Sequence, residues 1–217
     1  MNNIFHNTNK HLPSSVSSAV ILLHGYGSDG NDLLLPFTEA WGESLPHTAL
    51  IAPNGLIQRP VFGYEWFRLT HTSEEEITNG VSVCESLIMD LLAAVRDELK
   101  LTNRRIALLG FSQGAVVALH NGLLVNYEGE DLGGVVAISG ALPGRKNLNA
   151  QLKHKPPVRM IHGALDPVVP SIASELGAQA LAGAGVPVEL TIEPNLAHAI
   201  GPEGFAVATR FLQQQFA

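Results

Sequence analysis

Short apolar runs alternate along the chain with longer stretches in which apolar residues recur every three or four positions. The short runs are rich in valine, isoleucine and leucine and are bounded by turn residues, as is typical of parallel strands covered on both faces. They predict strands at residues 18–25 (SAVILLHG), 48–53 (TALIAP), 105–111 (RIALLGF), 133–140 (GGVVAISG), 158–163 (VRMIHG) and 188–194 (VELTIEP).

The stretches between these strands predict helices, most clearly at 80–100, where one apolar stripe recurs. Thr78 or Asn79 is the expected N-cap of this helix. The stripe consists of Leu87, Ile88, Leu91, Leu92, Val95 and Leu99. Further helices are expected at 31–44, 112–126, 171–183 and 202–216. Strands and helices in this order predict an α/β fold, with a doubly wound, mostly parallel sheet and helices on both faces.

The length of 217 residues fits one α/β domain over 1–217, in which 1–17 is a short N-terminal arm. The connection from 139 to 158 is too short for a large cap domain. The segment 54–79 is long for a connection, and such segments are often functional or mobile.

Composition narrows the expected partners. A net charge of −7 argues against nucleic acid and anionic membrane surfaces. No uninterrupted apolar run approaches the roughly 20 residues of a membrane-spanning helix, so stable membrane insertion is not expected. The N-terminus lacks the apolar middle of a secretory signal. The single cysteine, Cys84, cannot form an internal disulfide, which suits a reducing compartment. We therefore expect a cytoplasmic protein.

Residues 110–114 are Gly-Phe-Ser-Gln-Gly, between a predicted strand and a helix that starts with small residues. This is the pattern of a nucleophile elbow, in which a strained strand-to-helix corner exposes the serine hydroxyl. Gly110 and Gly114 let the strand and helix backbones approach closely. Ser112 is therefore the expected nucleophile, and the alternative is a tight turn with an incidental serine.

A serine nucleophile needs a base and a group that orients the base. On this architecture the chain order is Ser, acid, His. Asp166 follows the strand 158–163 in a loop that contains Pro167 and Pro170, which stiffen it. His198 is the only histidine after Asp166 and lies between the last strand and the final helix. We expect Asp166 and His198 to complete a catalytic triad.

The negative charge of an acyl-transfer intermediate requires preorganised hydrogen-bond donors. The amide of Gln113 lies at a predicted helix N-terminus, where the helix dipole favours an anion. The amide of Tyr26, in the glycine-rich segment LHGYGSDG, is the expected second donor. His24 and His162 each begin a His-Gly pair at a strand end, and we interpret both as structural.

An apolar pocket is expected beside Ser112. The segment 54–79 carries several aromatic residues, and we expect Trp66 and Phe67, together with Leu142, to line the substrate pocket. The alternative is that the aromatic side chains only anchor this segment on the core. The aromatic segment and the lack of a lid favour a small-molecule carboxylic ester with a small or medium-chain acyl group.

Taken together, LHGYGSDGND, GFSQG, SGAL, HGALDPVVP and the late His198 resemble the phospholipase/carboxylesterase family of α/β-hydrolases, which includes bacterial carboxylesterases and acyl-protein thioesterases. The resemblance extends from about residue 19 to the C-terminus. It implies an esterase or thioesterase without a cap domain, metal or cofactor, in which Ser112, Asp166 and His198 form the triad. It also implies the amides of Tyr26 and Gln113 as oxyanion donors. A homodimer is a further expectation, because the family often dimerises.

The resemblance leaves lysophospholipase and acyl-protein thioesterase activity as alternatives to carboxylesterase activity. Acyl-protein thioesterases often have a small aliphatic residue where Tyr26 stands. A phenol at this position narrows or redirects the pocket, which disfavours protein-linked palmitate as the substrate.

Other classes of function explain fewer of these residues. Gly25–Gly30 matches the G-x-G-x-x-G dinucleotide fingerprint, but no carboxylate follows the second strand to bind the ribose. A non-catalytic binding module on a hydrolase scaffold usually lacks a triad member, whereas this chain has all three. The absence of His-Glu-x-x-His and of paired cysteines disfavours a metal hydrolase.

Overall fold

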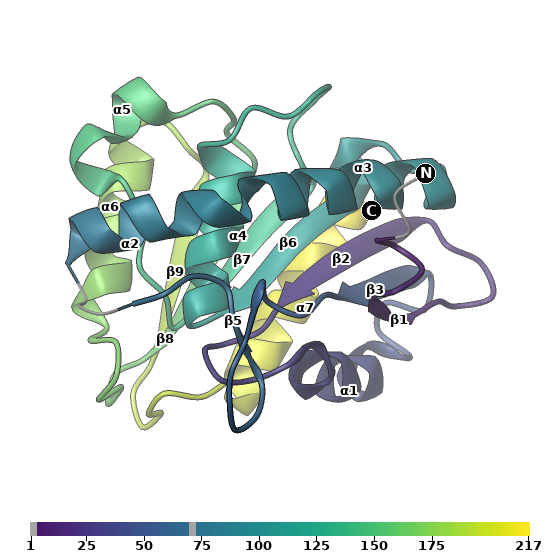
Figure 1. Ribbon diagram of the computed structural model, residues 1–217, viewed down its shortest axis with the longest axis horizontal. Helices are drawn as coiled ribbons and strands as arrows, with labels where there is room; N and C mark the ends of the chain where they lie inside the picture. Colours follow the sequence, from purple (N-terminus) through teal and green to yellow (C-terminus); the bar gives the residue numbers. More distant parts are fainter. Residues whose placement is uncertain (1–3, 70–72) are drawn as a thin grey trace.

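A seven-stranded sheet forms the centre of the computed structural model, which describes residues 4–69 and 73–217 (Figure 1). The strand order is β1-β3-β2-β6-β7-β8-β9. The edge strand β1 pairs antiparallel with β3, and all other pairs in this sheet are parallel. The strands are β1 (Asn9–His11), β2 (Ser18–Leu23), β3 (Thr48–Ala52), β6 (Ile106–Phe111), β7 (Gly134–Ile138), β8 (Val158–Gly163) and β9 (Val188–Glu193).

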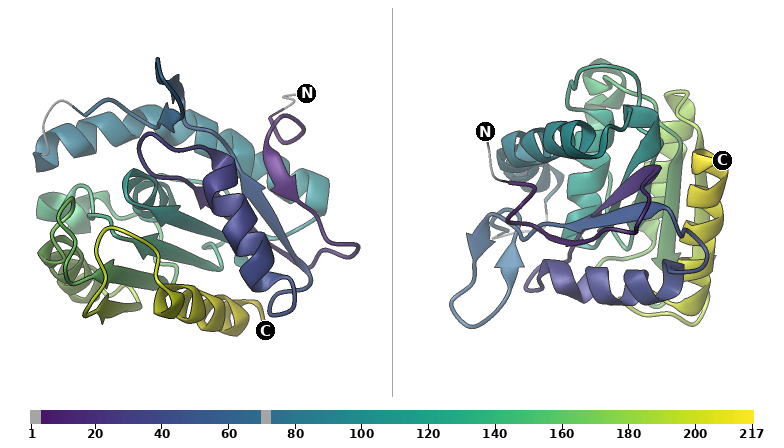
Figure 2. Two further views of the ribbon diagram at one scale, coloured as in Figure 1. Left: turned by 90° about the horizontal axis from the view of Figure 1, so that it is seen from below. Right: turned by 90° about the vertical axis from the view of Figure 1, so that its right-hand side faces the viewer.

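Helices cover both faces of the sheet, which confirms the expected doubly wound α/β architecture (Figure 2). One face packs against α3 (Glu85–Leu99), α4 (Gln113–Leu123) and α6 (Ile172–Gly183), and the other against α1 (Gly30–Trp41) and α7 (Pro202–Phe216). Alternate residues of β2 supply the two cores: Ala19 and Ile21 face the first layer, and Val20 and Leu22 face the second. This alternation follows from the two-residue repeat of a strand.

Part of the N-terminal arm belongs to the sheet. Its residues Asn9–His11 form the edge strand β1, which pairs with β3 in the register Asn9 to Ala52. These polar residues carry no alternating apolar signal, although they pair with β3 through the backbone. The sequence pattern therefore missed this strand.

The segment 54–79 contains more regular structure than expected. The strands β4 (Ile57–Gln58) and β5 (Tyr64–Glu65) form a hairpin that projects from the molecule (Figures 1 and 2). The helix α2 (Glu74–Val81) follows, and η1 (Ser82–Cys84) joins it to α3. Residues 70–72, which were expected to belong to this segment, lie outside the described residues.

The expected N-cap at Thr78 or Asn79 is wrong. Ser73 caps α2, and its hydroxyl accepts a hydrogen bond from the amide of Glu76. Thr78 lies within α2, where its hydroxyl donates to the carbonyl of Glu74 over 2.6 Å. The apolar stripe identified the helix correctly but did not mark its start, because the first turn of α2 is acidic and carries no apolar residue of the stripe.

The helical segment Glu74–Leu99 is, among the described residues, long and apolar enough to cross a membrane by length and composition. The sequence-based expectation that no such stretch exists considered only uninterrupted apolar runs. Buried core helices share this property, and here Val81, Ile88, Leu91 and Val95 are fully buried in the core of the same layer as α4. Packing in this core accounts for these four residues, whereas Val83 in the same segment is 56% exposed.

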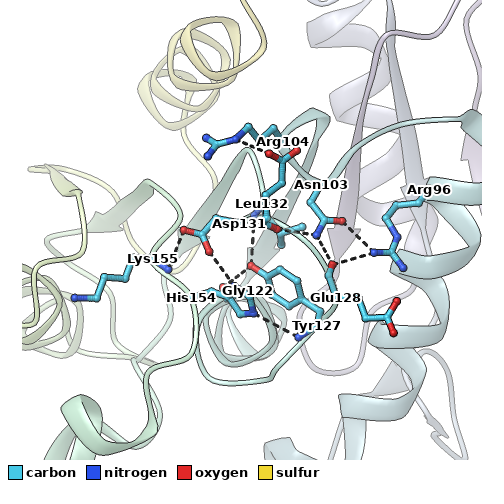
Figure 3. Close-up of polar contacts among 11 residues, drawn as sticks. Arg96, Asn103, Arg104, Gly122, Tyr127, Glu128, Asp131, Leu132, His154 and Lys155 are labelled. Carbon is cyan, nitrogen blue, oxygen red and sulfur yellow. Dashed lines mark hydrogen bonds and ion pairs between the residues drawn. The ribbon is translucent and has the colours of Figure 1, made fainter.

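A polar network holds the connection between α4 and β7 at the amino-terminal edge of the sheet (Figure 3). The Nδ2 atom of Asn103 donates to the carbonyls of Glu128 and Glu130, over 2.8 and 2.7 Å. The ring of Tyr127 stacks on His154 with centroids 3.6 Å apart, and His154 hydrogen-bonds the carboxylate of Asp131. Short 3₁₀ turns and one short helix complete the fold: η2 (Asn103–Arg105), η3 (Arg145–Asn147) and α5 (Leu148–Gln151).

Candidate active site

Ser112 lies at the junction of β6 and α4 in a strained backbone conformation. Its φ and ψ angles are 54° and −118°, a combination that side-chain-bearing residues rarely adopt. The amide of Ser112 donates to the carbonyl of Ile138 at the end of β7, over 2.8 Å. This bond, with the strand before and the helix after it, fixes the corner that the sequence pattern predicted.

Two glycines make this corner sterically feasible. A Cβ atom added to Gly110 would lie 2.1 Å from the carbonyl oxygen of Gly114. A Cβ atom added to Gly114 would lie 1.9 Å from the carbonyl oxygen of Leu23 in β2. Both distances are far below van der Waals contact, so side chains at these positions would separate α4 from the sheet.

The structure brings Ser112, His198 and Asp166 into one hydrogen-bonded chain. Nε2 of His198 lies 2.9 Å from Oγ of Ser112, and Nδ1 of His198 lies 2.6 Å from Oδ2 of Asp166. The three residues follow β6, β9 and β8 respectively, at the carboxyl edge of the sheet. The carboxylates of Glu128 and Asp131 lie in the connection between α4 and β7, at the opposite edge of the sheet.

The carboxyl group of Asp166 is held in its charged form. Its Oδ1 atom accepts hydrogen bonds from the amides of Val168 and Val169, over 2.8 and 2.9 Å. Burial of this carboxyl group opposes ionisation, but the hydrogen bonds from His198 and the two amides outweigh burial and lower the pKa of Asp166. The charged carboxylate therefore accepts the Nδ1 proton of His198 and leaves Nε2 to accept the proton of Ser112.

The other two histidines near the site have both ring nitrogens engaged by structural partners. In His24, Nδ1 donates to the carbonyl of Gly25 and Nε2 accepts from the amide of Gly55. Burial lowers the pKa of His24, so this ring is neutral. In His162, Nε2 donates to the carbonyl of Val169, and the ring also lies beside Asp166, with 3.2 Å between Nε2 and Oδ2. Both rings therefore support loops of the site.

The amides of Tyr26 and Gln113 are available to a ligand. Within the described residues neither amide donates to a protein acceptor. Gln113 is the first residue of α4, so its amide also lies at the positive end of that helix dipole. Tyr26, Ser112 and Gln113 line one cavity, and unpaired backbone donors near a serine hydroxyl are the usual components of an oxyanion hole.

The side chain of Gln113 has a structural role that the sequence analysis missed. Its Oε1 atom accepts from the amide of Trp66, and its Nε2 atom donates to the carbonyl of Phe67, over 2.9 and 2.7 Å. These bonds attach the segment after β5 to the nucleophile corner. No sequence signal separates this role from the backbone role expected of Gln113, because the partners are backbone groups 46 and 47 positions away.

A mainly apolar cavity of about 480 Å³ opens beside Ser112. Its apolar lining includes Phe67, Leu69, Ile77, Val116, Val169 and Ala173. The two other residues expected in the pocket lie elsewhere, and both predictions are corrected. Trp66 is fully buried in the core and donates from Nε1 to the carbonyl of His24, so it anchors its segment. Leu142 lines an adjacent cavity of about 250 Å³ that does not include Ser112.

Comparisons with known proteins identify relatives that match nearly the whole chain. A model of the family described as phospholipase/carboxylesterase matches residues 10–216. Acyl-protein thioesterase 1 homolog 1 of Dictyostelium discoideum is 29% identical over 206 residues, which cover 91% of this chain and 90% of that protein. Acyl-protein thioesterase 1 of Gibberella zeae is 27% identical over 223 residues, covering 93% of this chain and 92% of that protein.

Two esterases of known structure are also similar to the chain. The crystal structure of esterase PE8 is 35% identical and superposes with a TM-score of 0.88, covering 95% of this chain and 97% of that one. The carboxylesterase of Bacillus cereus superposes with a TM-score of 0.77 over 99% of this chain and all of that one (100%). At 21% identity, the latter comparison shows only that the fold is shared.

Proposed function

The chain belongs to the phospholipase/carboxylesterase family of α/β-hydrolases and is a carboxylic ester hydrolase of the serine type, and we propose that Ser112, His198 and Asp166 are its catalytic triad. The observation that carries this assignment is the continuous hydrogen-bonded chain from Oγ of Ser112 through His198 to Asp166. These residues match the three roles of nucleophile, base and orienting acid in type and in geometry.

The proposed reaction has two halves. In the first, Oγ of Ser112 bonds to the ester carbonyl carbon while Nε2 of His198 takes the hydroxyl proton. The bond from carbon to the alcohol oxygen then breaks, and His198 delivers the same proton to that oxygen. In the second half, water attacks the acyl-serine, gives a proton to His198, and the acid product leaves as Ser112 regains its proton.

The proposed oxyanion donors are the amides of Tyr26 and Gln113. Neither amide has a protein acceptor in the described part of the chain, which supports this role. The argument is strongest for Gln113, which is buried, because a buried amide is normally paired. Charge develops on the carbonyl oxygen only as the tetrahedral intermediate forms, so fixed donors stabilise the transition state more than the substrate.

We propose that the 480 Å³ cavity beside Ser112, called the acyl cavity below, binds the acyl chain of the substrate. Its lining residues are mostly aliphatic, which suits a small or medium-length hydrocarbon chain. The curated relatives are named acyl-protein thioesterases, so thioester cleavage is the second candidate activity. Lysophospholipase activity remains the other alternative.

A fluorophosphonate probe tests the nucleophile directly. We expect labelling of Ser112 in folded protein and its loss in Ser112→Ala. Asp166→Asn should retain the fold but lower kcat by about 10⁴-fold, because an amide cannot hold the imidazole in the required tautomer. Labelling that persists in Ser112→Ala, or full activity in Asp166→Asn, would contradict the assignment. Rates on nitrophenyl esters of increasing acyl length, beside an acyl-CoA and a lysolipid, identify the substrate class.

Two further properties are proposals supported by the sequence. We propose a cytoplasmic location without stable membrane insertion, supported by the net charge of −7 and by Cys84, which is buried and free. Cell fractionation tests this. Homodimer formation is carried over from the family, and sedimentation velocity distinguishes it from a monomer.

A further inference from the structure

A further cavity, of about 420 Å³, also reaches Ser112. It shares Ser112 and Tyr26 with the acyl cavity, and none of its other lining residues lines the acyl cavity. These other residues belong to the loop after β2, to α1, to the strand end before Ser112, and to the segment from His198 into α7. Its apolar lining residues are Leu33, Pro36, Phe37, Phe111, Ile200 and Phe205.

The position of His198 decides which part of an ester enters this cavity. His198 lines the 420 Å³ cavity and, among the described residues, does not line the acyl cavity. Its Nε2 atom must lie within hydrogen-bond reach of the leaving oxygen in order to protonate it. The alcohol part of the substrate therefore extends to the His198 side, and the acyl part extends to the side that Gln113 lines. We call the 420 Å³ cavity the alcohol cavity.

Tyr26 forms the wall between the cavities. It lines both of them, and its side chain is held from outside by Arg59 of the β4–β5 hairpin. The guanidinium carbon of Arg59 lies 4.2 Å from the centroid of the Tyr26 ring, a cation–π contact, and Nη1 of Arg59 hydrogen-bonds the phenol oxygen. Arg59 is itself paired with the buried carboxylate of Glu65, 3.6 Å away. The hairpin therefore fixes the orientation of the wall.

The chemistry of the alcohol cavity favours a flat apolar group. The ring of Phe111 lies 4.9 Å from that of His198, and the ring of Phe205 lies 4.7 Å from that of Phe37. Aromatic rings pack well against one another in offset or tilted arrangements at these separations. The polar lining residues Ser28 and Asp32 hydrogen-bond each other, and Asp32 also accepts from an amide of the α1 capping box.

We propose that the alcohol cavity selects esters of ring-bearing apolar alcohols, such as 2-phenylethanol, and that Tyr26 braced by Arg59 separates alcohol selection from acyl selection. The inference rests on the proposed function, since it takes Ser112 as nucleophile and His198 as the acid that protonates the leaving oxygen. The inference adds to the proposed function the class of alcohol in the substrate and the residues that select this alcohol.

Butyrate esters that differ only in the alcohol test this selection. Ethanol and 2-phenylethanol are similar as leaving groups, so a difference in kcat/KM reports binding in the alcohol cavity. We expect 2-phenylethyl butyrate to be favoured over ethyl butyrate by about 10- to 100-fold, because burial of a phenyl ring contributes about 1.5–3 kcal/mol. Equal kcat/KM values for the two esters would overturn the inference.

Acyl transfer gives a readout that does not depend on the leaving group. With nitrophenyl butyrate as donor, every reaction passes through the same butyryl-serine. An added alcohol can replace water, giving its proton to His198 and forming the butyrate ester as Ser112 is released. We expect 2-phenylethanol to capture the acyl group at lower concentration than ethanol. Equal capture by the two alcohols would also overturn the inference.

A matched pair of variants locates the effect. Pro36→Trp places a large side chain at a lining position on the exposed side of α1 and removes a proline from the helix interior. Leu35→Trp adds the same side chain at the neighbouring position, which is 67% exposed and does not line the cavity. We expect Pro36→Trp to lower the preference for 2-phenylethyl butyrate by about tenfold and Leu35→Trp to retain it. Equal behaviour of the two variants would contradict the proposal.

The wall is tested by Tyr26→Leu, which keeps the backbone amide. We expect this variant to flatten both the alcohol preference and the acyl-length profile, because the two cavities merge. If Tyr26→Leu keeps the wild-type selectivity, Tyr26 does not separate the two cavities, and that part of the proposal is wrong. This test does not depend on whether Pro36→Trp folds. The two levels of inference fail differently: hydrolysis and Ser112 labelling without alcohol selectivity overturn only this inference, whereas loss of labelling overturns the proposed function.

Discussion

At the scale of single residues, the partners of each imidazole decide what it can do. His24, His162 and His198 all lie at the carboxyl edge of the sheet. The nitrogens of His24 and His162 bond to backbone groups and to the hydroxyl of Ser174, whereas Nε2 of His198 faces the hydroxyl of Ser112. The partner of His24 Nδ1 is the next residue, whereas the partner of His198 Nε2 lies 86 positions away, so residue type alone does not distinguish these three roles.

The buried ring of His24 makes folding stability depend on pH. Burial lowers the pKa of His24, whereas in the unfolded chain an imidazole titrates near 6.5. Below about pH 6.5 the unfolded chain therefore binds a proton that the folded chain does not, and the free energy of unfolding falls as pH decreases. His24→Gln should show a smaller loss of stability between pH 7 and 5 in chemical denaturation.

His6→Gln makes the same substitution at an exposed position, where His6 lies 3.6 Å from the carboxylate of Glu98. The slope of unfolding free energy against pH in His24→Gln is compared with the slopes of this variant and of the wild type. If His24→Gln and His6→Gln give the same slope as the wild type, His24 does not contribute to this dependence.

At the scale of elements, the nucleophile corner depends on backbone contact among β2, β6 and α4. We expect Gly114→Ala to lower the free energy of unfolding by at least about 1–3 kcal/mol and to lower kcat/KM, because the added Cβ overlaps the carbonyl of Leu23. Gly183→Ala is the matched control, since a Cβ there meets nothing within 4 Å. It should be neutral or stabilise α6 by up to about 1 kcal/mol. Thermal melts of both variants test this, and equal melting temperatures would contradict it.

Hydrogen bonds between elements also explain why the segment after β5 is ordered next to the site. The side chain of Gln113 binds the backbone of Trp66 and Phe67, and Trp66 in turn binds the carbonyl of His24. The nucleophile corner, the loop after β2 and the aromatic segment are therefore one connected unit. Phe67 is placed in the acyl cavity by this unit and not by its own apolar character.

At the scale of the whole molecule, the carboxyl ends and the amino ends of the parallel strands carry different groups of residues. The carboxyl edge carries Ser112, Asp166 and His198, and the amino edge carries the polar network around Asn103 (Figure 3). In parallel sheets ligands bind at the carboxyl ends of the strands, where loops diverge. We therefore expect the network at the other edge to contribute to stability and not to catalysis.

This separation predicts the effect of removing Asn103. Asn103→Ala should lower the free energy of unfolding by about 1–3 kcal/mol, because two carbonyls lose a buried donor, and should leave kcat/KM unchanged. Glu128→Ala is the matched control, because Glu128 contributes its backbone carbonyl to the network. It should change neither quantity. A large loss of activity in Asn103→Ala would contradict the separation of the two edges.

The sequence predicted the elements that bury apolar side chains and missed those that do not. All six strands of the parallel part of the sheet and the long helices carry apolar patterns, because each must bury one or both faces. Edge strand β1, the hairpin β4–β5 and the first turn of α2 are polar or very short, so their apolar patterns are weak. Apolar character predicted three pocket residues, of which only Phe67 lines the acyl cavity. Trp66 is buried in the core, and Leu142 lines the adjacent cavity.

By itself, the sequence determined the α/β architecture, the corner at Ser112 and the residue types of the proposed triad, because these depend on local periodicity, on glycine sterics and on chain order. Only the tertiary structure decided which imidazole faces Ser112, what the side chain of Gln113 binds, and how Tyr26 and Arg59 divide the space around the nucleophile. Those properties depend on distances between residues that are far apart in the chain, and such distances exist only once the sheet and its helices have packed.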